Sequence, residues 1–503
     1  MIKSENNMSV SLKPLIIIFG LIFLCYYNVL STNYYYIDDL GRSLEGYSGW
    51  SRNGRPLADL FFYVISFGAP LPDISPLPQI LGIALLSLGA YLTGKTYLGH
   101  SERVGGLSFL LCLPLAISPF YFENMSYKYD AFPMSLSVLC AMLPFVVRIN
   151  GSIKFLTASI VSILLSLCLY QASLNIYIIY TMLYVLNRFK EGKDLDGFKA
   201  IGLSIAGLLI GYIIYSLLIS PNFIEGDYNL QHSQVSSFEL NFLMDAIFGN
   251  FKVFYYVLST SMSTTMLALV LITACMALIG AVRLCREKSE STGIIKLLRN
   301  SIILVSPFLV LLMIAGPMLL LKSAVVSARV FVAFGAVLVF YNILACWMLG
   351  LRSKIMWSLS ILYFFYMLGA AFSYGNALDN QEKYDNEVIT TIISDLNSNN
   401  LANAKHISFI GMLPISPEGR LAIKKYPFFA HLIHPTINGR WSWGLRHIKH
   451  FDMNHDFNSG DFHSALKDNL CVYTSITNGV VFNSYYDRES DSVIYDFTKR
   501  SCK

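Results

Sequence analysis

Long apolar segments recur along the first three quarters of the chain, and they restrict it to folds that a lipid bilayer allows. A membrane-spanning helix needs about 20 apolar residues. By that measure the sequence contains eleven candidate spans, at residues 12–30, 80–98, 105–121, 131–147, 155–169, 172–188, 200–219, 262–282, 300–320, 330–349 and 355–373. A mean hydropathy of +0.52 and 14% charged residues are typical of a membrane protein rather than a soluble one. The sequence therefore predicts a polytopic α-helical membrane protein with about 11 transmembrane helices.

Basic residues distinguish the two sides of the predicted bundle. They concentrate in the loops and helix ends that face the cytoplasm if the N-terminus lies inside and the C-terminus outside. The predicted outer loops then cover residues 31–79, 121–130, 220–261 and 321–329. Seven basic residues lie in these loops: Arg42, Arg52, Arg55, Lys128, Lys252, Lys322 and Arg329. Because topology does not explain these cations, they are candidates for binding an anionic substrate.

Two adjacent carboxylates, Asp38 and Asp39, follow the first span directly, with Arg42 close behind. Charges at the edge of a membrane are costly, and where they occur they often mark a substrate path or a reaction centre. Neighbouring residues point in different directions, so one of the pair could accept a proton while the other holds the arginine or the loop. Glu123 and Asp130 add two carboxylates in the second outer loop. The alternative is that these charges form interfacial salt bridges that only fix the loops.

Composition changes after the last apolar segment, and residues 374–503 are polar and mixed. A helix over 376–399 and a strand over 406–411 predict an α/β domain on the outer side, separate from a transmembrane domain over 1–373. The spacing His447-x-x-His450 has no carboxylate or cysteine to complete a metal site, so we expect no metal and no cofactor. Cys471 and Cys502 could form a disulfide in an oxidising compartment, and two unpaired thiols are the alternative.

Carboxylates, cations and aromatic rings at one side of a membrane favour glycosyl transfer from a lipid-linked phosphosugar to a hydroxyl. A carboxylate takes the hydroxyl proton as the oxygen attacks the anomeric carbon, and cations stabilise the departing phosphate. The candidate catalytic residues are Asp38 and Asp39, followed by Glu123 and Asp130. The candidate phosphate-binding residues are Lys322 and Arg329, with Arg42 and Lys128 as helpers. The candidate substrate-binding residues are Arg55, Tyr127, Tyr170, Gln171, Trp441 and Trp443.

Three motifs resemble those of the serotype-converting O-antigen glucosyltransferases of the Gtr type. They are Asp38-Asp39-x-x-Arg42, Gly54-Arg55-Pro56 and Glu123-Asn124-x-Ser126-Tyr127-Lys128-x-Asp130. An acidic pair after the first helix is also a general feature of membrane glycosyltransferases of the class C fold. The resemblance extends over the whole chain, including the many spans and the outer C-terminal domain.

The resemblance implies that undecaprenyl-phosphate glucose is the donor and that a sugar of the lipid-linked O-antigen repeat is the acceptor. It places a multi-pass protein in the bacterial inner membrane, with its active site and C-terminal domain facing the periplasm. It also implies a donor-sugar synthase and a flippase as functional partners, a metal-independent reaction, and no nucleic acid partner.

Three other kinds of membrane protein are alternatives to a glucosyltransferase. An O-antigen polymerase is expected to have arginine-rich outer loops and no outer tail of this length. A lipid-linked sugar flippase needs no clustered carboxylates at the outer surface. A secondary transporter is expected to show an internal repeat or helices broken at matching positions in its two halves, and the sequence has neither.

Overall fold

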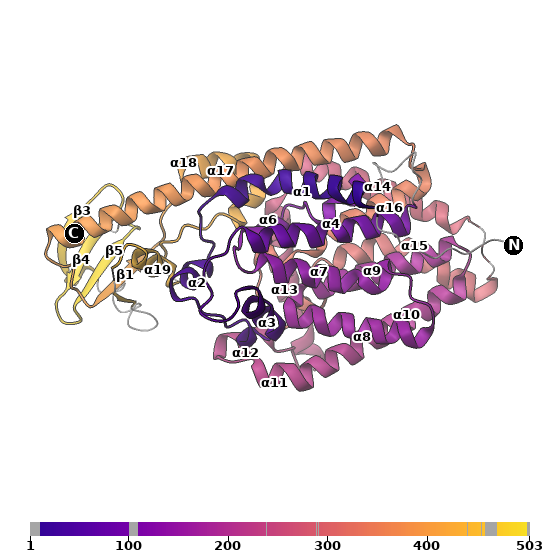
Figure 1. Cartoon of the computed structure of the whole chain (residues 1–503), viewed down its shortest axis with the longest axis horizontal. Coiled ribbons are helices and arrows are strands. Elements are labelled where there is room, and N and C mark those ends of the chain that lie inside the picture. Colours follow the sequence, from indigo (N-terminus) through magenta and orange to yellow (C-terminus); the bar gives the residue numbers. More distant parts are fainter. Residues whose placement is uncertain are drawn as a thin grey trace.

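The computed structural model describes residues 11–99, 109–237, 239–287, 289, 291–439, 441–453, 455–457 and 470–499. A bundle of long, roughly parallel helices forms most of the molecule, and a small β-sheet lies beyond one end of it (Figure 1). The described chain starts at the end of the bundle farthest from the sheet, because α1 (Leu12–Ser31) runs toward the sheet.

The remaining long helices follow the apolar segments of the sequence. They are α4 (Leu77–Tyr97), α7 (Ala131–Val146), α8 (Ser152–Leu169), α9 (Leu174–Lys190), α10 (Asp194–Ile214), α14 (Thr264–Cys285), α15 (Gly293–Leu312), α16 (Ala333–Leu349) and α17 (Lys354–Ser398). Within the described residues, seven helical segments are long and apolar enough to cross a membrane; they comprise α1, α4, α8, α10 with its extension to Phe223, α14, α15 and α17. These helices fit a membrane protein, whereas the count of eleven spans and their orientation stay predictions.

Two predicted spans differ from the helices that form. The described part of the third span, predicted over 105–121, is mostly irregular. Residues 109 and 110 are helical, the 3-10 turn η2 covers Leu113–Leu115, and α6 begins at Tyr121. Pro114 and Pro119 lack the N–H that a continuing helix needs, and their rings clash with the preceding turn. The span predicted over 300–320 is shifted, because α15 ends at Leu312 and the 3-10 turn η5 (Gly316–Leu320) follows. Gly316 there has a φ of +50°, which ends a regular helix.

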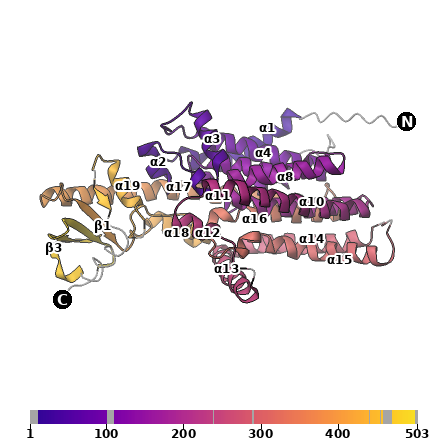
Figure 2. The same ribbon diagram turned by 90° about the horizontal axis from the view of Figure 1, so that it is seen from below.

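Short elements gather at the end of the bundle nearest the sheet (Figures 1 and 2). They are α2 (Asp39–Glu45), η1 (Ser51–Asn53), α3 (Pro56–Ile65), α6 (Tyr121–Ser126), η3 (Gln171–Ser173), the π-helical turn η4 (Tyr215–Ile219), α11 (Ser220–Phe223), α12 (Asp227–Ser233), α13 (Leu240–Ser261) and η6 (Ala328–Val330). α3 begins at Pro56, and η3 follows Tyr170 between α8 and α9. All four predicted outer loops therefore converge on one end of the molecule.

The sheet contains five strands in the order β2-β1-β5-β4-β3. The strands are β1 (His406–Ile410), β2 (Asp456–Phe457), β3 (Thr474–Asn478), β4 (Asn483–Asp487) and β5 (Ser492–Asp496). β1 is parallel to β2 and β5, and β5, β4 and β3 are antiparallel. The connecting elements are α18 (Pro417–Lys425), η7 (Pro427–His431), α19 (Trp443–Lys449) and η8 (Leu470–Val472). The strand predicted at 406–411 is confirmed as β1.

α17 joins the bundle to the sheet as one uninterrupted helix of 45 residues. Its first half packs on α1, where a Cβ on Gly375 would lie 2.5 Å from the Cβ of Asn28. Its second half covers the sheet, with Ile389 and Ile392 in the same buried cluster as Phe409. The boundary predicted between residues 373 and 374 therefore falls inside a continuous helix, and the helix fixes how the two parts are oriented.

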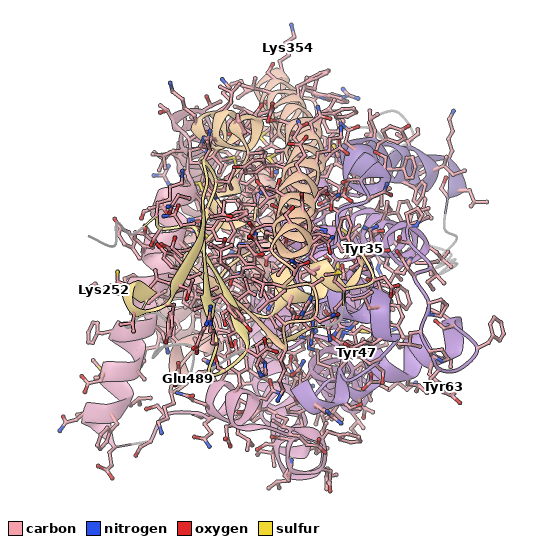
Figure 3. All side chains as sticks on the ribbon, turned by 90° about the vertical axis from the view of Figure 1, so that its left-hand side faces the viewer. Tyr35, Tyr47, Tyr63, Lys252, Lys354 and Glu489 are labelled. Carbon is pink, nitrogen blue, oxygen red and sulfur yellow. The ribbon has the colours of Figure 1, made fainter. Side chains whose placement is uncertain are left out.

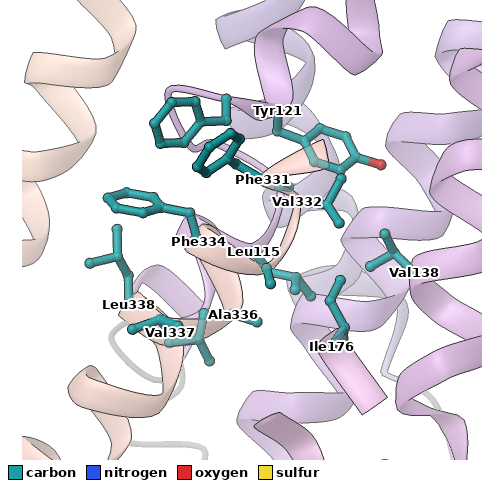
Figure 4. Packing of buried hydrophobic residues seen from close by; sticks show 14 of the residues in the cluster. Leu115, Tyr121, Val138, Ile176, Phe331, Val332, Phe334, Ala336, Val337 and Leu338 are labelled. Carbon is teal, nitrogen blue, oxygen red and sulfur yellow. The ribbon is translucent and has the colours of Figure 1, made fainter. Parts of the chain in front are cut away.

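The core of the bundle is built from large apolar side chains of distant segments. Figure 4 shows Phe331 and Phe334, at the start of α16, beside Leu115 and Tyr121. The rings of Phe120 and Phe331 stack with their centroids 4.8 Å apart. The irregular segment before α6 is thus held by packing rather than by helical hydrogen bonds, which is why the sequence pattern alone did not reveal it.

The ion pair between Asp194 and Arg299 supplies a test of the bundle. Both side chains are fully buried, with Nε of Arg299 3.0 Å from Oδ1 of Asp194. Removing one partner of such a pair leaves an uncompensated charge, so Arg299→Ala and Asp194→Ala should each lower the free energy of unfolding by about 3–5 kcal/mol. Thermal unfolding in detergent measures the loss. The exposed ion pair of Lys383 and Asp379 is the control, and Lys383→Ala should leave the unfolding midpoint unchanged. Equal shifts of the midpoint in the Arg299 and Lys383 variants would contradict the role of the buried pair.

Candidate active site

Asp130 is the point at which the first two outer loops are joined. Its Oδ2 lies 3.0 Å from Nη1 of Arg42, and its Oδ1 accepts hydrogen bonds from Nη1 of Arg55 at 3.0 Å and from Nε1 of Trp50 at 2.8 Å. The carboxylate is almost fully buried, and the guanidinium of Arg42 also lies over the ring of Trp50, 4.2 Å from its centroid. Both oxygens of Asp130 are engaged, so it holds the loops and is not available as a general base.

Asp39 is also buried and engaged. Its Oδ2 accepts the backbone N–H of Lys128 at 2.7 Å, which ties α2 to the loop after α6. Burial raises the pKa of Asp39 well above its usual value, while the nearby charge of Arg42 and the Lys128 N–H act in the opposite direction. A carboxyl group with no exposed surface cannot reach a substrate hydroxyl. Asp39 therefore matches the loop-holding role that the sequence left open for one member of the acidic pair.

Glu123 is the third buried carboxylate, and it binds the loop before α16. Its Oε2 accepts the backbone N–H of Arg329 at 2.5 Å, and its Oε1 lies 3.9 Å from Nη1 of the same arginine. Burial raises the pKa of Glu123 to about 7, although the charge and N–H of Arg329 lower it in part. Glu123 thus fixes the position of Arg329 and is itself closed to solvent.

Asp38 differs from these three carboxylates. It is partly exposed, and its side chain forms no hydrogen bond or ion pair with any residue that the structure describes. It directly follows Ile37, whose φ of +50° is rare for a β-branched residue and costs about 1–3 kcal/mol. The strained turn is stabilised by Asp39, whose backbone N–H donates to Tyr36 O at 3.0 Å. The fold therefore presents one carboxylate to the open side of the loop cluster.

The four cations predicted to bind phosphate fall into two groups. Arg42 forms an ion pair with Asp130. The Nζ of Lys128 donates to Asn33 O at 3.2 Å and lies 4.2 Å from the centroid of the Tyr35 ring. Lys322 is exposed and has no ion pair among the described residues, and the side chain of Arg329 is 23% exposed. Only Lys322 and Arg329 remain accessible to an anionic ligand.

Aromatic contacts place Arg329 in the same region as Asp38. The guanidinium of Arg329 lies over the ring of Tyr127, 5.3 Å from its centroid. Tyr127 packs edge-on against Tyr36 at 4.8 Å, and Tyr36 is two residues from Asp38. A pair of packed tyrosines thus joins Arg329 to the segment that leads into Asp38.

The other predicted substrate-binding residues divide in a similar way. Arg55 is paired with Asp130 and lies over Tyr170, and Tyr170 donates to Arg329 O at 3.0 Å. Gln171 donates to Asn53 O at 2.8 Å. These three residues, like the buried Tyr127, hold the loops together.

Trp441 and Trp443, by contrast, keep open surface. Their rings stack at 5.5 Å between centroids with an angle of 10°, and Trp441 is 46% exposed. Both belong to the C-terminal part of the chain, before and at the start of α19.

The C-terminal part packs directly on the acidic loop. α19 lies against α2, where the Nη1 of Arg446 donates to the hydroxyl of Tyr47 at 3.3 Å. The ring of His450 stacks on Tyr35 at 5.4 Å, and Tyr36 donates to Leu432 O at 2.8 Å. Tyr35 and Tyr47, labelled in Figure 3, thus lie where the two parts of the chain meet.

A buried polar network fixes α19 to α17. The N–H and hydroxyl of Thr436 both donate to Oδ2 of Asp385 at 3.0 Å, and Nδ1 of His447 lies 2.8 Å from the same hydroxyl. The Nε2 of His447 is 2.8 Å from Oδ1 of Asn386, and burial lowers the pKa of His447 to about 4. A neutral histidine in hydrogen bonds fulfils a structural role, and the described residues contain no cluster that could hold a metal ion.

The described cysteines fall into two groups. Cys471 is disulfide-bonded. Cys502, its predicted partner, lies outside the described residues, so the pairing stays a prediction. The seven cysteines of the helical bundle are free.

Comparison with known proteins identifies the family. The model of the family described as "Glucosyl transferase GtrII" matches residues 7–340. The chain belongs to the GtrII glucosyltransferase family. It is also 31% identical over 432 residues, which cover 85% of this chain and 87% of the relative, to the "Uncharacterized 55.3 kDa protein in gtrB 5'region" of Salmonella phage P22. No solved structure matches it. The resemblance drawn from the three motifs is confirmed, and this GtrII chain is a glycosyltransferase.

Sequence reasoning missed several residues that build the site of this GtrII protein. Trp50 and Tyr36 each make contacts with partners from distant segments, and neither lies in a motif. Asp59 accepts the backbone N–H groups of Gly49 and Trp50, at 2.9 and 3.1 Å, and so shapes the loop before α3. An aspartate three residues after an N-terminal proline is a common helix start, so the sequence carried no signal for this role.

The raised pKa of Glu123 gives the GtrII fold a predicted pH dependence. Between the ordinary value of 4.5 and about 7, the folded protein keeps a proton that the unfolded chain has lost. The contribution of Glu123 to stability is therefore present below 4.5, falls as the pH rises through this window and is lost above it. Glu123→Gln cannot ionise and should flatten this part of the profile. Unfolding midpoints between pH 4.5 and 8 test this, and parallel wild-type and variant profiles would contradict it.

Proposed function

We propose that this protein transfers a glucosyl residue from undecaprenyl-phosphate glucose to a sugar of the lipid-linked O-antigen repeat, on the periplasmic face of the bacterial inner membrane. Membership of the GtrII family supports glycosyl transfer and serotype conversion. The single observation that carries the mechanism is that Asp38, alone among the four candidate catalytic carboxylates Asp38, Asp39, Glu123 and Asp130, is partly exposed and unengaged by the described residues.

Asp38 acts as the general base in this proposal. It accepts the proton of the acceptor hydroxyl as the hydroxyl oxygen forms a bond to the anomeric carbon of the donor sugar. The bond from that carbon to the phosphate oxygen breaks, and the phosphate leaves with the electron pair. Arg329 and Lys322 stabilise the charge on the departing phosphate. The orientation of Arg329 depends on Glu123, and that of Asp38 depends on the Tyr36–Asp39 turn.

The surroundings of the site fit a lipid-linked donor. The loop cluster lies at one end of a bundle whose helices are apolar enough to span a membrane, so a polyprenyl chain can remain in the bilayer while its phosphosugar reaches Asp38. A donor of this kind requires a synthase that makes it and a flippase that presents it, and we propose these as functional partners. The relative from Salmonella phage P22 is named for its position beside gtrB, which agrees with a donor-making partner.

The two adjacent aspartates give the first test of this function. Asp38→Asn keeps the shape of the side chain and removes its basicity, so transfer should fall by roughly 100-fold or more while the amount of protein in the membrane stays normal. Asp39→Asn should mainly lower stability, because it weakens the acceptor of the Lys128 N–H. Transfer is measured with purified enzyme and donor, and stability by the unfolding midpoint. Full activity of Asp38→Asn would show that the base lies elsewhere.

Arg329 gives the second test. Charge-assisted hydrogen bonds to a phosphate contribute about 1.5–3 kcal/mol, so Arg329→Ala should raise the donor KM by roughly 10- to 100-fold. Arg329→Lys should restore only part of the affinity, because the planar fork is lost. Arg52→Ala is a matched control, since its guanidinium is exposed and pairs with Glu225 on the same side of the molecule. A donor complex with the phosphate more than about 8 Å from both Lys322 and Arg329 would contradict the assignment.

A further inference from the structure

One exposed aromatic side chain near Asp38, that of Tyr228, has no role in the proposed mechanism. Tyr228 lies on α12 and is 53% exposed. Its ring meets Trp441 at an angle of 89°, with the centroids 6.3 Å apart. Trp441 in turn stacks on Trp443. Three aromatic side chains from two distant parts of the chain therefore form a corner with two walls at right angles.

This aromatic corner lies beside the free carboxylate. Burial raises the pKa of the Tyr228 phenol, and the negative charge of Asp38 adds to the rise, so the two groups are within electrostatic reach. Trp443 starts α19, and α19 packs on α2, the helix that Asp38 precedes. Trp443 and Asp38 thus lie at the starts of two helices that pack on each other, and Tyr228 is added from α12.

Segment 224–236, which carries Tyr228, crosses the loop cluster as a strap. At one end the N–H of Glu225 donates to Arg52 O at 3.1 Å, and Nδ2 of Asn229 donates to the same oxygen at 3.1 Å. At the other end Nδ1 of His232 lies 2.7 Å from Ser323 O, and Lys322 N donates to Gln234 O at 2.9 Å.

The strap is held by these hydrogen bonds and not by a core, because α12 contains no buried residue. It connects the first outer loop with the loop that carries Lys322 and Arg329. Tyr228 therefore lies on a segment that is tied both to the first outer loop and to the loop that carries Lys322.

The chemistry of the corner favours a sugar. Exposed aromatic rings cost free energy in water and commonly mark a binding surface. The C–H faces of a pyranose pack on such rings, and a phenol hydroxyl adds a directed hydrogen bond. Among the described residues no lysine or arginine lies over the rings of the corner, which suits an uncharged saccharide better than a phosphate. The ring of His232 packs edge-on against Tyr228, with the centroids 4.4 Å apart.

We propose that Tyr228, Trp441 and Trp443 form the acceptor-saccharide binding site, and that Tyr228 positions the acceptor hydroxyl at Asp38. The inference rests on the proposed function and assigns its acceptor to one face of the site. It also gives the C-terminal part of the chain a role in recognising the acceptor, because two of the three rings come from it.

The test uses the full-length enzyme in detergent, with a polyprenyl-phosphate glucose donor. The acceptor probe is polysaccharide released from unmodified lipopolysaccharide of a strain that lacks this gene. Tyr228→Ala and Trp443→Ala should each raise the acceptor KM by about tenfold, which is 1.4 kcal/mol. Slow release of glucose to water without acceptor needs only the donor site and the base, so both variants should keep the wild-type rate. Tyr228→Phe keeps the ring and should show a smaller rise than Tyr228→Ala.

Tyr63→Ala is the matched control, because Tyr63 is a similarly exposed tyrosine on α3 at the rim of the molecule in Figure 3. An unchanged acceptor KM in both Tyr228→Ala and Trp443→Ala would overturn the inference, and so would an equal loss of glucose release to water. If one alanine variant does not fold, the acceptor KM of the other alanine variant and that of Tyr228→Phe test the inference.

A second measurement separates the inference from the proposed function. Binding of the same polysaccharide should change the intrinsic fluorescence of the wild type, and Trp441→Ala and Trp443→Ala should each reduce that change. A wild-type enzyme that releases no glucose from the donor, with or without acceptor, would contradict the proposed function even if the fluorescence change were present. Active enzyme with no fluorescence change on binding would contradict the aromatic corner alone.

Discussion

The buried carboxylate of Asp130 is the interaction on which the outer end of this protein depends. Two arginines and an indole N–H converge on its two oxygens. Arg42 brings α2 to it, Arg55 brings the start of α3, and Trp50 brings the loop between them. A buried ion pair of this kind costs desolvation on both sides, and the close contacts to both carboxylate oxygens offset that cost. Removing Asp130 would leave the buried guanidinium groups of Arg42 and Arg55 without their counter-charge.

Burial and hydrogen bonding divide the four candidate catalytic carboxylates into two classes. Asp39, Glu123 and Asp130 are buried and accept hydrogen bonds from the chain itself, and each joins loops that are distant in the sequence. Asp38 follows the turn at Ile37, is partly exposed, and forms no side-chain hydrogen bond or ion pair with a described residue. Three of the four candidate carboxylates thus fix the loops, and Asp38 stays partly exposed. In the proposed mechanism this fixes the geometry around the base before substrate binds.

The continuous helix α17 explains how the sheet is held beside the loop cluster at one end of the bundle. Because α17 passes from the bundle into the sheet without a break, the C-terminal part cannot move freely. Its network of Asp385, Thr436 and His447 holds α19 on the acidic loop, and α19 brings Trp443 to the edge of the site. Acceptor recognition and catalysis can then be performed by residues from opposite ends of the chain.

The sequence by itself determined the class of fold, the positions of most long helices and the family, because these depend on apolar segment length and on short motifs. It also placed the four carboxylates and the cations on one side. It did not determine which of Asp38 and Asp39 is free, because their roles depend on a backbone N–H from Lys128 and on a positive φ at Ile37. Nor did it reveal the pairing of Tyr228 with Trp441. Such contacts join segments far apart in the chain, and only tertiary packing decides which side chains are buried against a partner and which remain open to a substrate.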